Sequence, residues 1–313
     1  MTASFGSIRS RRPATRVAIV VLMAATVALI VALAIKIPAW VRATEAIADP
    51  KDRIAIQNEL IKTAAQVLGG IFLVSGAYFA WQNLLLTRDG QITDRFNHAV
   101  EHVGSDRLEI RLGGVYALAR IARSSEKDHW PAMQVLCARL RATTKDRAPN
   151  AALPAEAQAI LDVLGTRSRH FEAPGQLLDF TRANLAGANL SGCHFEGARF
   201  QGADLHQANF SGAHLAGASF AGADLVEASF RGADCTEANF LTAELQHATF
   251  RDGILRNAVV FGANFEGTSL LGANLAGARF AIREQFTKAL ADHTTVMPEF
   301  SAIPSEIPQI LPP

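Results

Sequence analysis

Three polar side chains near the middle of the chain have a spacing that could bind a metal ion. His98, Glu101 and His102 form an H-x-x-E-H pattern, which some zinc proteases use. On a helix the two imidazoles would lie on one face, as a zinc ion requires. No third ligand follows in the sequence, and with nine histidines in the chain a chance match is unsurprising. We therefore interpret His98 and His102 as solvated helix residues and predict no metal site.

The other reactive or glycine-rich positions also lack a catalytic arrangement. Cys137, Cys193 and Cys235 share no close spacing, which indicates neither a disulfide framework nor a zinc knuckle and suits a reducing compartment. Gly113-Gly114 lies within a helical pattern, where it would permit close helix packing, and is not in a phosphate-binding loop. The sequence gathers no nucleophile, base and orienting group. We predict no catalytic residue, no cofactor and no enzymatic activity.

Composition indicates where apolar residues and charges concentrate. Hydrophobic residues form 49% of the chain and charged residues 19%, which is apolar for a soluble protein. The net charge of +1 gives no global field that would attract nucleic acid or an acidic substrate. The apolar excess lies near the N-terminus and in a periodic region after residue 180.

Two apolar segments are long enough to cross a bilayer. Residues 17–35 contain no charge and would span about 28 Å as a helix. Residues 1–16 form a basic leader whose four arginines favour a cytoplasmic N-terminus: Arg9, Arg11, Arg12 and Arg16. Residues 64–86 form the second predicted span, after a mixed-charge external loop with some helix at 36–63. Two crossings predict that both termini lie in the cytoplasm.

Two alternatives concern these spans. Ala32-Leu33-Ala34 resembles a signal-peptide cleavage site and Ser10-Arg11-Arg12 resembles a twin-arginine signal, so export of the body is the alternative topology. Small residues at four-residue spacing would let the spans pack on each other or on a second copy, although alanine is also common filler in membrane helices: Ala24, Ala28, Ala32, Gly76 and Ala80.

Residues 87–169 have the apolar period of short amphipathic helices. The pattern predicts one helix from Ile92 that ends near Gly104, and a second over 108–122. Asp128 is the predicted cap of a third helix, and a fourth runs from Pro154 to Gly165. We expect a small all-α region that resembles HEAT-type helix pairs.

From residue 180 to 280 every fifth residue is large and apolar. Of these 21 positions 19 are Leu or Phe, and 17 of the residues two places earlier are Ala. Five residues advance an α-helix by about 500°, so the apolar residues would form no face. On a flat strand an odd period would send successive residues to opposite faces. The chain must therefore turn once in each repeat, with the large residue and the alanine pointing inward.

The order of Phe and Leu indicates how many sides each coil has. Phe recurs at every second repeat from Phe200 to Phe250, with Leu or Cys between. A three-sided coil would stack Phe on Leu, whereas a four-sided coil, with four repeats in each turn, stacks Phe on Phe. The sequence favours a coil with an even number of sides.

The repeat units resemble a known family. Ala183-Asn184-Leu185-Ala186-Gly187 and Ala203-Asp204-Leu205 are similar to the A-(D/N)-L-x-x unit of pentapeptide-repeat proteins. The resemblance implies a right-handed quadrilateral parallel β-helix of about five coils over 175–282. Residues 111–120 and 127–130 are similar to the helical part of bacterial members that carry membrane spans. This resemblance implies a location at a bacterial inner membrane. The helices before residue 170 and residues 284–290 should cap the coil, within a C-terminal cap and Pro-rich tail at 283–313.

The predicted function is that of a non-enzymatic scaffold. The β-helix would present outward side chains to an unidentified protein partner at the cytoplasmic membrane face, with no nucleic acid bound. The first alternative is a DNA mimic that binds topoisomerase, as some pentapeptide-repeat proteins do. Six arginines against nine acids over 180–280 give only a weak acidic field for that role. The second alternative is a metal-dependent enzyme in the helical region. Four histidines are dispersed over the coil, and the first and third of them share a column: His194, His206, His214 and His247.

Overall fold

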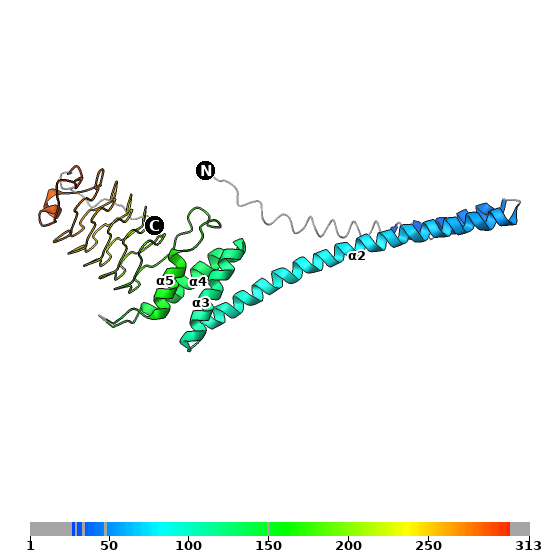
Figure 1. Cartoon of the computed structure of the whole chain (residues 1–313), viewed down its shortest axis with the longest axis horizontal. Coiled ribbons are helices and arrows are strands. Elements are labelled where there is room, and N and C mark those ends of the chain that lie inside the picture. Colours follow the sequence, from blue (N-terminus) through cyan, green and yellow to red (C-terminus); the bar gives the residue numbers. More distant parts are fainter. Residues whose placement is uncertain (1–26, 29, 33–34, 47–48, 149–150, 301–313) are drawn as a thin grey trace. The chain divides into compact units, whose positions relative to one another are not determined.

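The computed structural model describes residues 27–28, 30–32, 35–46, 49–148 and 151–300. The predicted leader and most of the predicted span at 17–35 lie outside the described residues, as does the tail from residue 301. The chain divides into two compact units, residues 1–91 and 92–313, which are described separately (Figure 1).

The predicted loop at 36–63 is largely helical. Residues 35–43 are helical, the 3-10 helix η1 covers Thr44–Ala46, and α2 covers Pro50–Val103. Asp49 precedes α2 and its carboxylate accepts a hydrogen bond from the N–H of Lys51 at 2.8 Å. Pro50 stands at the first helical position, where its fixed φ is favourable. This start signal lies well before residue 64, so α2 begins within the segment that the sequence predicts as an external loop with some helix. The external position of that segment stays a prediction.

Helix α2 also joins two segments that the sequence predicted as separate. The span at 64–86 and the amphipathic helix from Ile92 belong to one helix that ends at Val103. The polar residues between them include Gly90 but no proline, and one glycine weakens a helix without ending it. Within the described residues, Pro50–Leu84 is the one stretch of helix long and apolar enough to cross a membrane.

Three further helices pack against one another in the second unit (Figure 1). They are α3 (Leu108–Ser124), α4 (Glu126–Thr144) and α5 (Ala155–Gly165). The predicted helices are confirmed, except that Ser125 rather than Asp128 caps α4, with its hydroxyl accepting a hydrogen bond from the Asp128 N–H at 3.3 Å. Pro131 lies inside α4, beyond the first turn. The similarity to HEAT-type pairs stays a prediction.

A buried carboxylate links the three helices. Glu156 of α5 accepts hydrogen bonds from Arg111 of α3 and Arg139 of α4, each at 2.6 Å. Burial raises the pKa of Glu156, but the two guanidinium groups outweigh it and hold the pKa below its usual value. Because Glu156 is 1% exposed, loss of either arginine would leave buried charge poorly compensated.

The repeats form a four-sided coil, as predicted. Residues four repeats apart in sequence form parallel bridges from Asp179↔Arg199 through Val259↔Arg279, so one turn contains four repeats. The Phe200 and Phe220 rings stack with centroids 5.0 Å apart, and Phe210 and Phe230 stack at 4.9 Å. Both ladders are fully buried, and Figure 1 shows the stacked coils. The prediction of inward Leu and Phe is confirmed.

The sides of the coil are too short to form extended strands. In the described part of the chain each side contributes an isolated bridge followed by a turn. Within the described residues the β-helix therefore consists of isolated parallel bridges and turns, without regular strands. Each repeat turns with a positive φ at its fifth residue, which Gly187 and Gly212 adopt at 70° and 67° and Glu227 adopts at 58°.

The helical region closes the N-terminal end of the coil on all four sides. Backbone groups in the first coil would lack partners there, because no earlier coil precedes them. The contacts are Arg141 to the Asp179 carbonyl, Arg147 to Asn184, Gln158 to Asn189, and both Gly165 and Arg167 to His194. The prediction that these helices form a cap is confirmed.

The segment after the last repeat closes the other end. Leu290 and Val296 form parallel bridges with Ser269 and Asn274. The 3-10 helix η2 (Arg283–Phe286) brings Phe286 onto Phe265, with ring centroids 4.6 Å apart. Gln285 donates hydrogen bonds to the carbonyls of Val260 and Ala263 at 2.8 and 2.9 Å. Residues 283–296 therefore cover the C-terminal end of the coil.

Candidate binding faces of the β-helix

The four repeats of each turn sort the outward side chains into four columns. Residues that occupy equivalent positions in successive coils lie directly above one another, about 4.8 Å apart. The column that contains Asn184, Asp204, Asp224, Glu244 and Asn264 differs from the others in charge. We call its repeats the acidic column: residues 183–187, 203–207, 223–227, 243–247 and 263–267.

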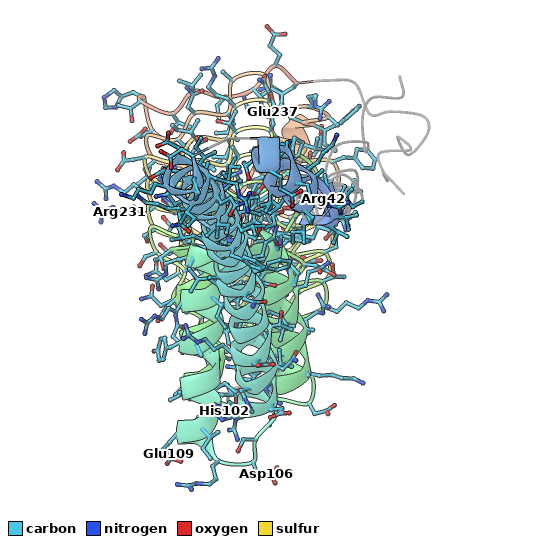
Figure 2. The ribbon with its side chains drawn as sticks, turned by 90° about the vertical axis from the view of Figure 1, so that its right-hand side faces the viewer. Arg42, His102, Asp106, Glu109, Arg231 and Glu237 are labelled. Carbon is cyan, nitrogen blue, oxygen red and sulfur yellow. The ribbon has the colours of Figure 1, made fainter. Side chains whose placement is uncertain are left out.

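Negative charge concentrates on the acidic column. It carries five of the nine acids in 180–280 and none of the six arginines: Asp204, Asp224, Glu227, Glu244 and Glu266. The arginines lie on the other columns; Figure 2 shows Arg231 projecting outward, away from the coil. The net charge of the whole coil conceals this asymmetry, because it sums acids and arginines from all four columns. Sorting the sequence by its four-repeat register would have found it.

Local hydrogen bonds fix the orientation of the central acids. The Asp204 carboxylate accepts a hydrogen bond from the His206 N–H at 3.2 Å, and Asp224 accepts one from the Val226 N–H at 3.0 Å. These turns hold one carboxylate oxygen and leave the other available. Glu244 and Glu227 accept hydrogen bonds from the neutral amides of Gln246 and Gln207. In the described chain only Glu266 of this column forms an ion pair, with Lys288 at 2.7 Å.

The first position of the acidic column already binds a guanidinium group. Arg147, in the loop after α4, donates to the side-chain oxygen of Asn184 at 2.9 Å and to the Ala186 carbonyl at 2.8 Å. A cavity of about 500 Å³ beside it is lined by Arg147, Asp204 and Asp224 among others. The outward oxygens of this column are therefore accessible to a planar cation.

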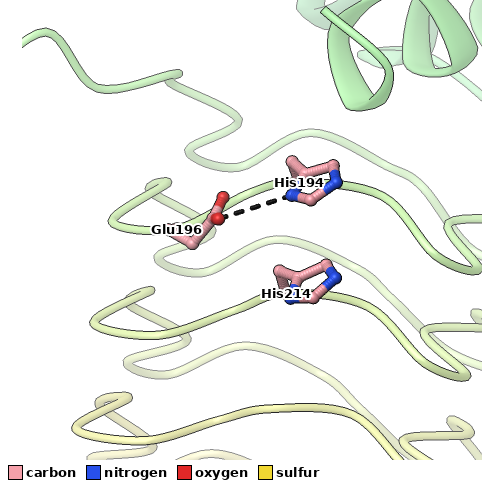
Figure 3. A group of neighbouring side chains, drawn as sticks. All are labelled: His194, Glu196 and His214. Carbon is pink, nitrogen blue, oxygen red and sulfur yellow. Dashed lines mark hydrogen bonds and ion pairs between the residues drawn. The ribbon is translucent and has the colours of Figure 1, made fainter. Parts of the chain in front are cut away.

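A stacked pair of histidines lies on another column. The rings of His194 and His214 are parallel, with centroids 4.3 Å apart, and Glu196 lies beside His194 at 3.4 Å (Figure 3). Their potential ligand atoms lie within 4.8 Å of one another. Two features oppose a preformed metal site. Parallel rings direct their lone pairs in parallel rather than toward one point, and Glu196 is paired with Arg169 at 2.8 Å.

Electrostatics around Glu196 favour its charged form. Burial raises its pKa, but a backbone hydrogen bond and the charge of Arg169 outweigh that effect and lower the pKa overall. Glu196 thus forms an ion pair with Arg169 next to the N-terminal cap. The expected vertical alignment of His194 and His214 is confirmed, and the prediction of no metal ligand stays a prediction.

The H-x-x-E-H residues lie on one side of α2, as the sequence predicted. His98 pairs with Glu101 at 3.4 Å, and both side chains are more than 70% exposed. His98 and His102 line a groove against α3. Within the described residues, the one three-residue group with metal-ligand spacing is that of His194, and it does not include His98 or His102.

All three cysteines are buried. Burial raises the pKa of Cys137 and Cys193 from 9.0 to about 11 and raises that of Cys235 further. Thiols that stay protonated are weak nucleophiles. Cys193 and Cys235 occupy the inward positions that Ala and Leu take in other repeats.

Comparison with known proteins identifies the repeats. A family model described as pentapeptide repeats matches residues 179–217 in eight copies, and a pentapeptide repeat region model matches 203–280. Residues 179–280 belong to the pentapeptide-repeat family. This membership implies the right-handed quadrilateral β-helix that the sequence predicted. Neither model describes an enzyme. No curated protein matches the chain.

Solved pentapeptide-repeat structures are similar to part of the chain. One is a protein from the Arabidopsis thaliana thylakoid lumen, with 33% identity over 33% of this chain and 70% of that one, at a TM-score of 0.32. HetL from Nostoc sp. strain PCC 7120, involved in heterocyst differentiation regulation, has 28% identity over 36% of this chain and 56% of its own, at 0.21. QnrB1, a plasmid-mediated fluoroquinolone resistance protein, has 18% identity over 37% and 67%, at 0.17.

Proposed function

We propose that this chain is a non-enzymatic, membrane-anchored binding module whose acidic column docks a basic segment of a protein partner. The observation that carries the proposal is the placement of five acids and no arginine or lysine on one column of the coil. A rigid surface with charge of one sign steers and orients a partner of the opposite sign. The partner is expected on the cytoplasmic face of the bacterial inner membrane.

The spacing of the column suits arginines or lysines on a helix. Successive carboxylates stand about 4.8 Å apart along the coil axis. Side chains at positions i and i+4 of an α-helix have Cβ atoms about 5–6 Å apart, and they are long enough to absorb the difference. Arg147 demonstrates that a guanidinium group can pair with the first position of the same column.

The membrane part of the proposal rests on α2. Within Pro50–Leu84, Phe72, Leu73 and Val74 are 65%, 74% and 66% exposed. Burial of each such side chain away from water is favourable by about 1.5–3 kcal/mol, so three neighbouring ones together favour burial by several kcal/mol. A lipid environment supplies that burial, and the basic leader at 1–16 favours a cytoplasmic N-terminus. The predicted second span at 17–35 and the homo-oligomer stay part of this proposal.

A peptide of defined charge tests the binding surface. The full chain in detergent is titrated with a labelled helical peptide that carries arginine at i, i+4 and i+8, and anisotropy reports the affinity. The triple variant Asp204→Asn, Asp224→Asn, Glu244→Gln should weaken binding by about tenfold or more at low salt, from three exposed ion pairs. Asparagine keeps the oxygens that accept the turn hydrogen bonds.

A matched variant provides the control. Asp234→Asn, Glu237→Gln and Asp252→Asn remove the same charge from other columns. This variant should bind the peptide about as well as the unmodified chain. Equal weakening by both triple variants would show that net charge, rather than the acidic column, determines binding. Alkaline carbonate extraction of cell membranes tests the anchor independently, since an anchored chain stays in the pellet.

The DNA-mimic alternative gains one supporting observation, since the acidic column is a linear array of carboxylates. Its weakness is the distribution of charge around the coil. Glu196, Asp234 and Glu237 lie on the opposite column with Arg256, whereas the two columns between them carry five arginines and one acid of 180–280. The coil therefore presents negative charge on two of its four sides, not all round as a duplex does. Binding of a topoisomerase that survives neutralisation of the acidic column would support this alternative over the peptide-binding proposal.

A further inference from the structure

A groove between α2 and α3 combines an apolar floor with a basic rim. Four residues line it from α3 and five from α2, and its volume is about 460 Å³: Ala117, Arg120, Ile121 and Ser124, with Ile92, Arg95, His98, Ala99 and His102. Each set follows one helix stripe at intervals of three and four residues. The groove lies wholly within the second unit.

Helices α2 and α3 are in close contact at Gly114 and leave a groove beside that contact. Gly114 lets α3 approach the α2 backbone, because a Cβ at this position would lie 2.6 Å from the Val103 nitrogen and 2.8 Å from the Ala99 carbonyl. Away from that contact the Ala117 side chain is small, so space remains between the two helices. The floor is apolar, with Ala99 2% and Ile121 8% exposed.

The rim carries positive charge without compensation. Arg95 and Arg120 form no ion pair among the contacts of the described residues, and no acid lines the groove. Glu101 pairs with His98 on the outer side at 3.4 Å. A guanidinium group binds phosphate oxygens through paired N–H donors, whereas the floor favours hydrocarbon. The complementary ligand is an anionic amphiphile.

We propose that this groove binds the headgroup and upper acyl region of an acidic phospholipid. The inference rests on the proposed membrane anchoring. Arginines of a membrane-anchored chain encounter anionic lipid at high local concentration. Arg95 and Arg120 would hold the phosphate, and Ala99, Ala117 and Ile121 would contact the chains.

Native mass spectrometry of the full chain in detergent tests the site. The chain is titrated with phosphatidylglycerol and, separately, with phosphatidylcholine. The unmodified chain should bind phosphatidylglycerol about tenfold more tightly, and Arg95→Gln with Arg120→Gln should remove most of this preference. The control variant, Arg231→Gln with Arg251→Gln, removes the same charge from the coil and should keep the preference. Retention of the preference in Arg95→Gln/Arg120→Gln would overturn the proposal.

A second variant and two competitors distinguish bound lipid from free phosphate and from a second copy of the chain. Ala117→Leu fills the groove without changing charge and should also lose the bound lipid; unchanged lipid binding would contradict a site between the helices. Inorganic phosphate and glycerol phosphate should not displace the lipid, and full displacement would mean a free-phosphate site instead. A change of oligomeric mass without a change in bound lipid would mean that a second copy covers the groove. Melting of each variant by circular dichroism excludes misfolding as the cause.

Failure of the lipid-binding proposal can be distinguished from failure of the proposed membrane anchor. If carbonate extraction releases the chain from membranes, the anchor is wrong and the lipid proposal loses its basis. If the chain stays in the membrane pellet but Arg95→Gln/Arg120→Gln keeps its lipid preference, only the groove proposal fails. The peptide-binding test on the acidic column is unaffected by either outcome.

Discussion

Gln158 and Asn189 form the two hydrogen bonds that a peptide group of a preceding coil would form. The side-chain nitrogen of Gln158 donates to the Asn189 carbonyl at 2.7 Å, and its oxygen accepts from the Asn189 N–H at 3.0 Å. The amide of a helix residue thus replaces the missing backbone at the open end of the β-helix. This relationship joins the helical region and the coil into one folded unit.

Replacing Gln158 with alanine should lower the free energy of unfolding by about 1–2 kcal/mol, because two backbone groups lose a partner and must bind water instead. Urea denaturation followed by circular dichroism measures the change. Gln134→Ala is the matched control, since Gln134 is exposed in α4. The control should change stability by less than about 0.5 kcal/mol. Equal effects would mean that Gln158 does not act as a cap.

The stacked phenylalanines should dominate the stability of the coil. Phe220 is fully buried between Phe200 and Phe240, with ring centroids 5.0 and 5.1 Å away. Phe220→Ala should therefore cost about 3–5 kcal/mol of unfolding free energy. Glu227→Ala, at an exposed corner of the same region, should cost under about 0.5 kcal/mol. Identical melting temperatures of the two variants would contradict the inward assignment.

Two adjacent glycines should respond in opposite directions to alanine. A Cβ at Gly114 would meet backbone atoms of α2 at 2.6 and 2.8 Å, whereas Gly113 has nothing within 4 Å. Gly114→Ala should lower the melting temperature, since backbone cannot move aside easily. Gly113→Ala should raise stability by about 0.5–1 kcal/mol through helix propensity. Stabilisation by Gly114→Ala would show that α2 and α3 are not in close contact there.

The buried thiols give a stability that depends on pH. Burial raises the pKa of Cys137 and Cys193 from 9.0 to about 11. Below pH 9 both thiols are protonated in folded and unfolded chains. Between pH 9 and 11 the unfolded chain releases protons that the folded chain retains, so the free energy of unfolding should fall as pH rises.

Replacing both cysteines with alanine should reduce this fall, as measured by urea denaturation at pH 8, 9.5 and 10.5. At pH 8 the native chain should also resist a thiol reagent until it is unfolded, because a protonated, buried thiol is a poor nucleophile. Rapid labelling of the native chain would contradict the burial.

Most of the coil could be predicted from the sequence because its constraints are local and repeated. The five-residue period fixes which side chains point inward, and the alternation of Phe220 with Leu225 and Phe230 favours an even number of sides. The resemblance to pentapeptide repeats then implies four. The caps also followed from the need to satisfy terminal backbone groups. Their particular contacts, such as Gln158 with Asn189, depend on tertiary packing that no local pattern contains.

Two features were not predicted, for different reasons. The continuity of α2 through residues 87–91 was missed because a change of composition was interpreted as a break, although only a proline or a strong cap would end a helix there. The acidic column was missed because net charge conceals how charge is arranged in space. Asp204, Asp224 and Glu244 are far apart in the sequence and come together only through the coil.

Site-specific cross-linking in intact cells tests the central claim most directly. A photoreactive residue replaces Val226 in the acidic column or Ala216, which has the equivalent position on the opposite side of the coil. Cross-links from position 226 should map to lysine- and arginine-rich segments of a membrane-proximal protein and disappear when Asp204 and Asp224 become asparagine. Equal cross-linking from position 216, or cross-links that survive this neutralisation, would contradict binding through the acidic column.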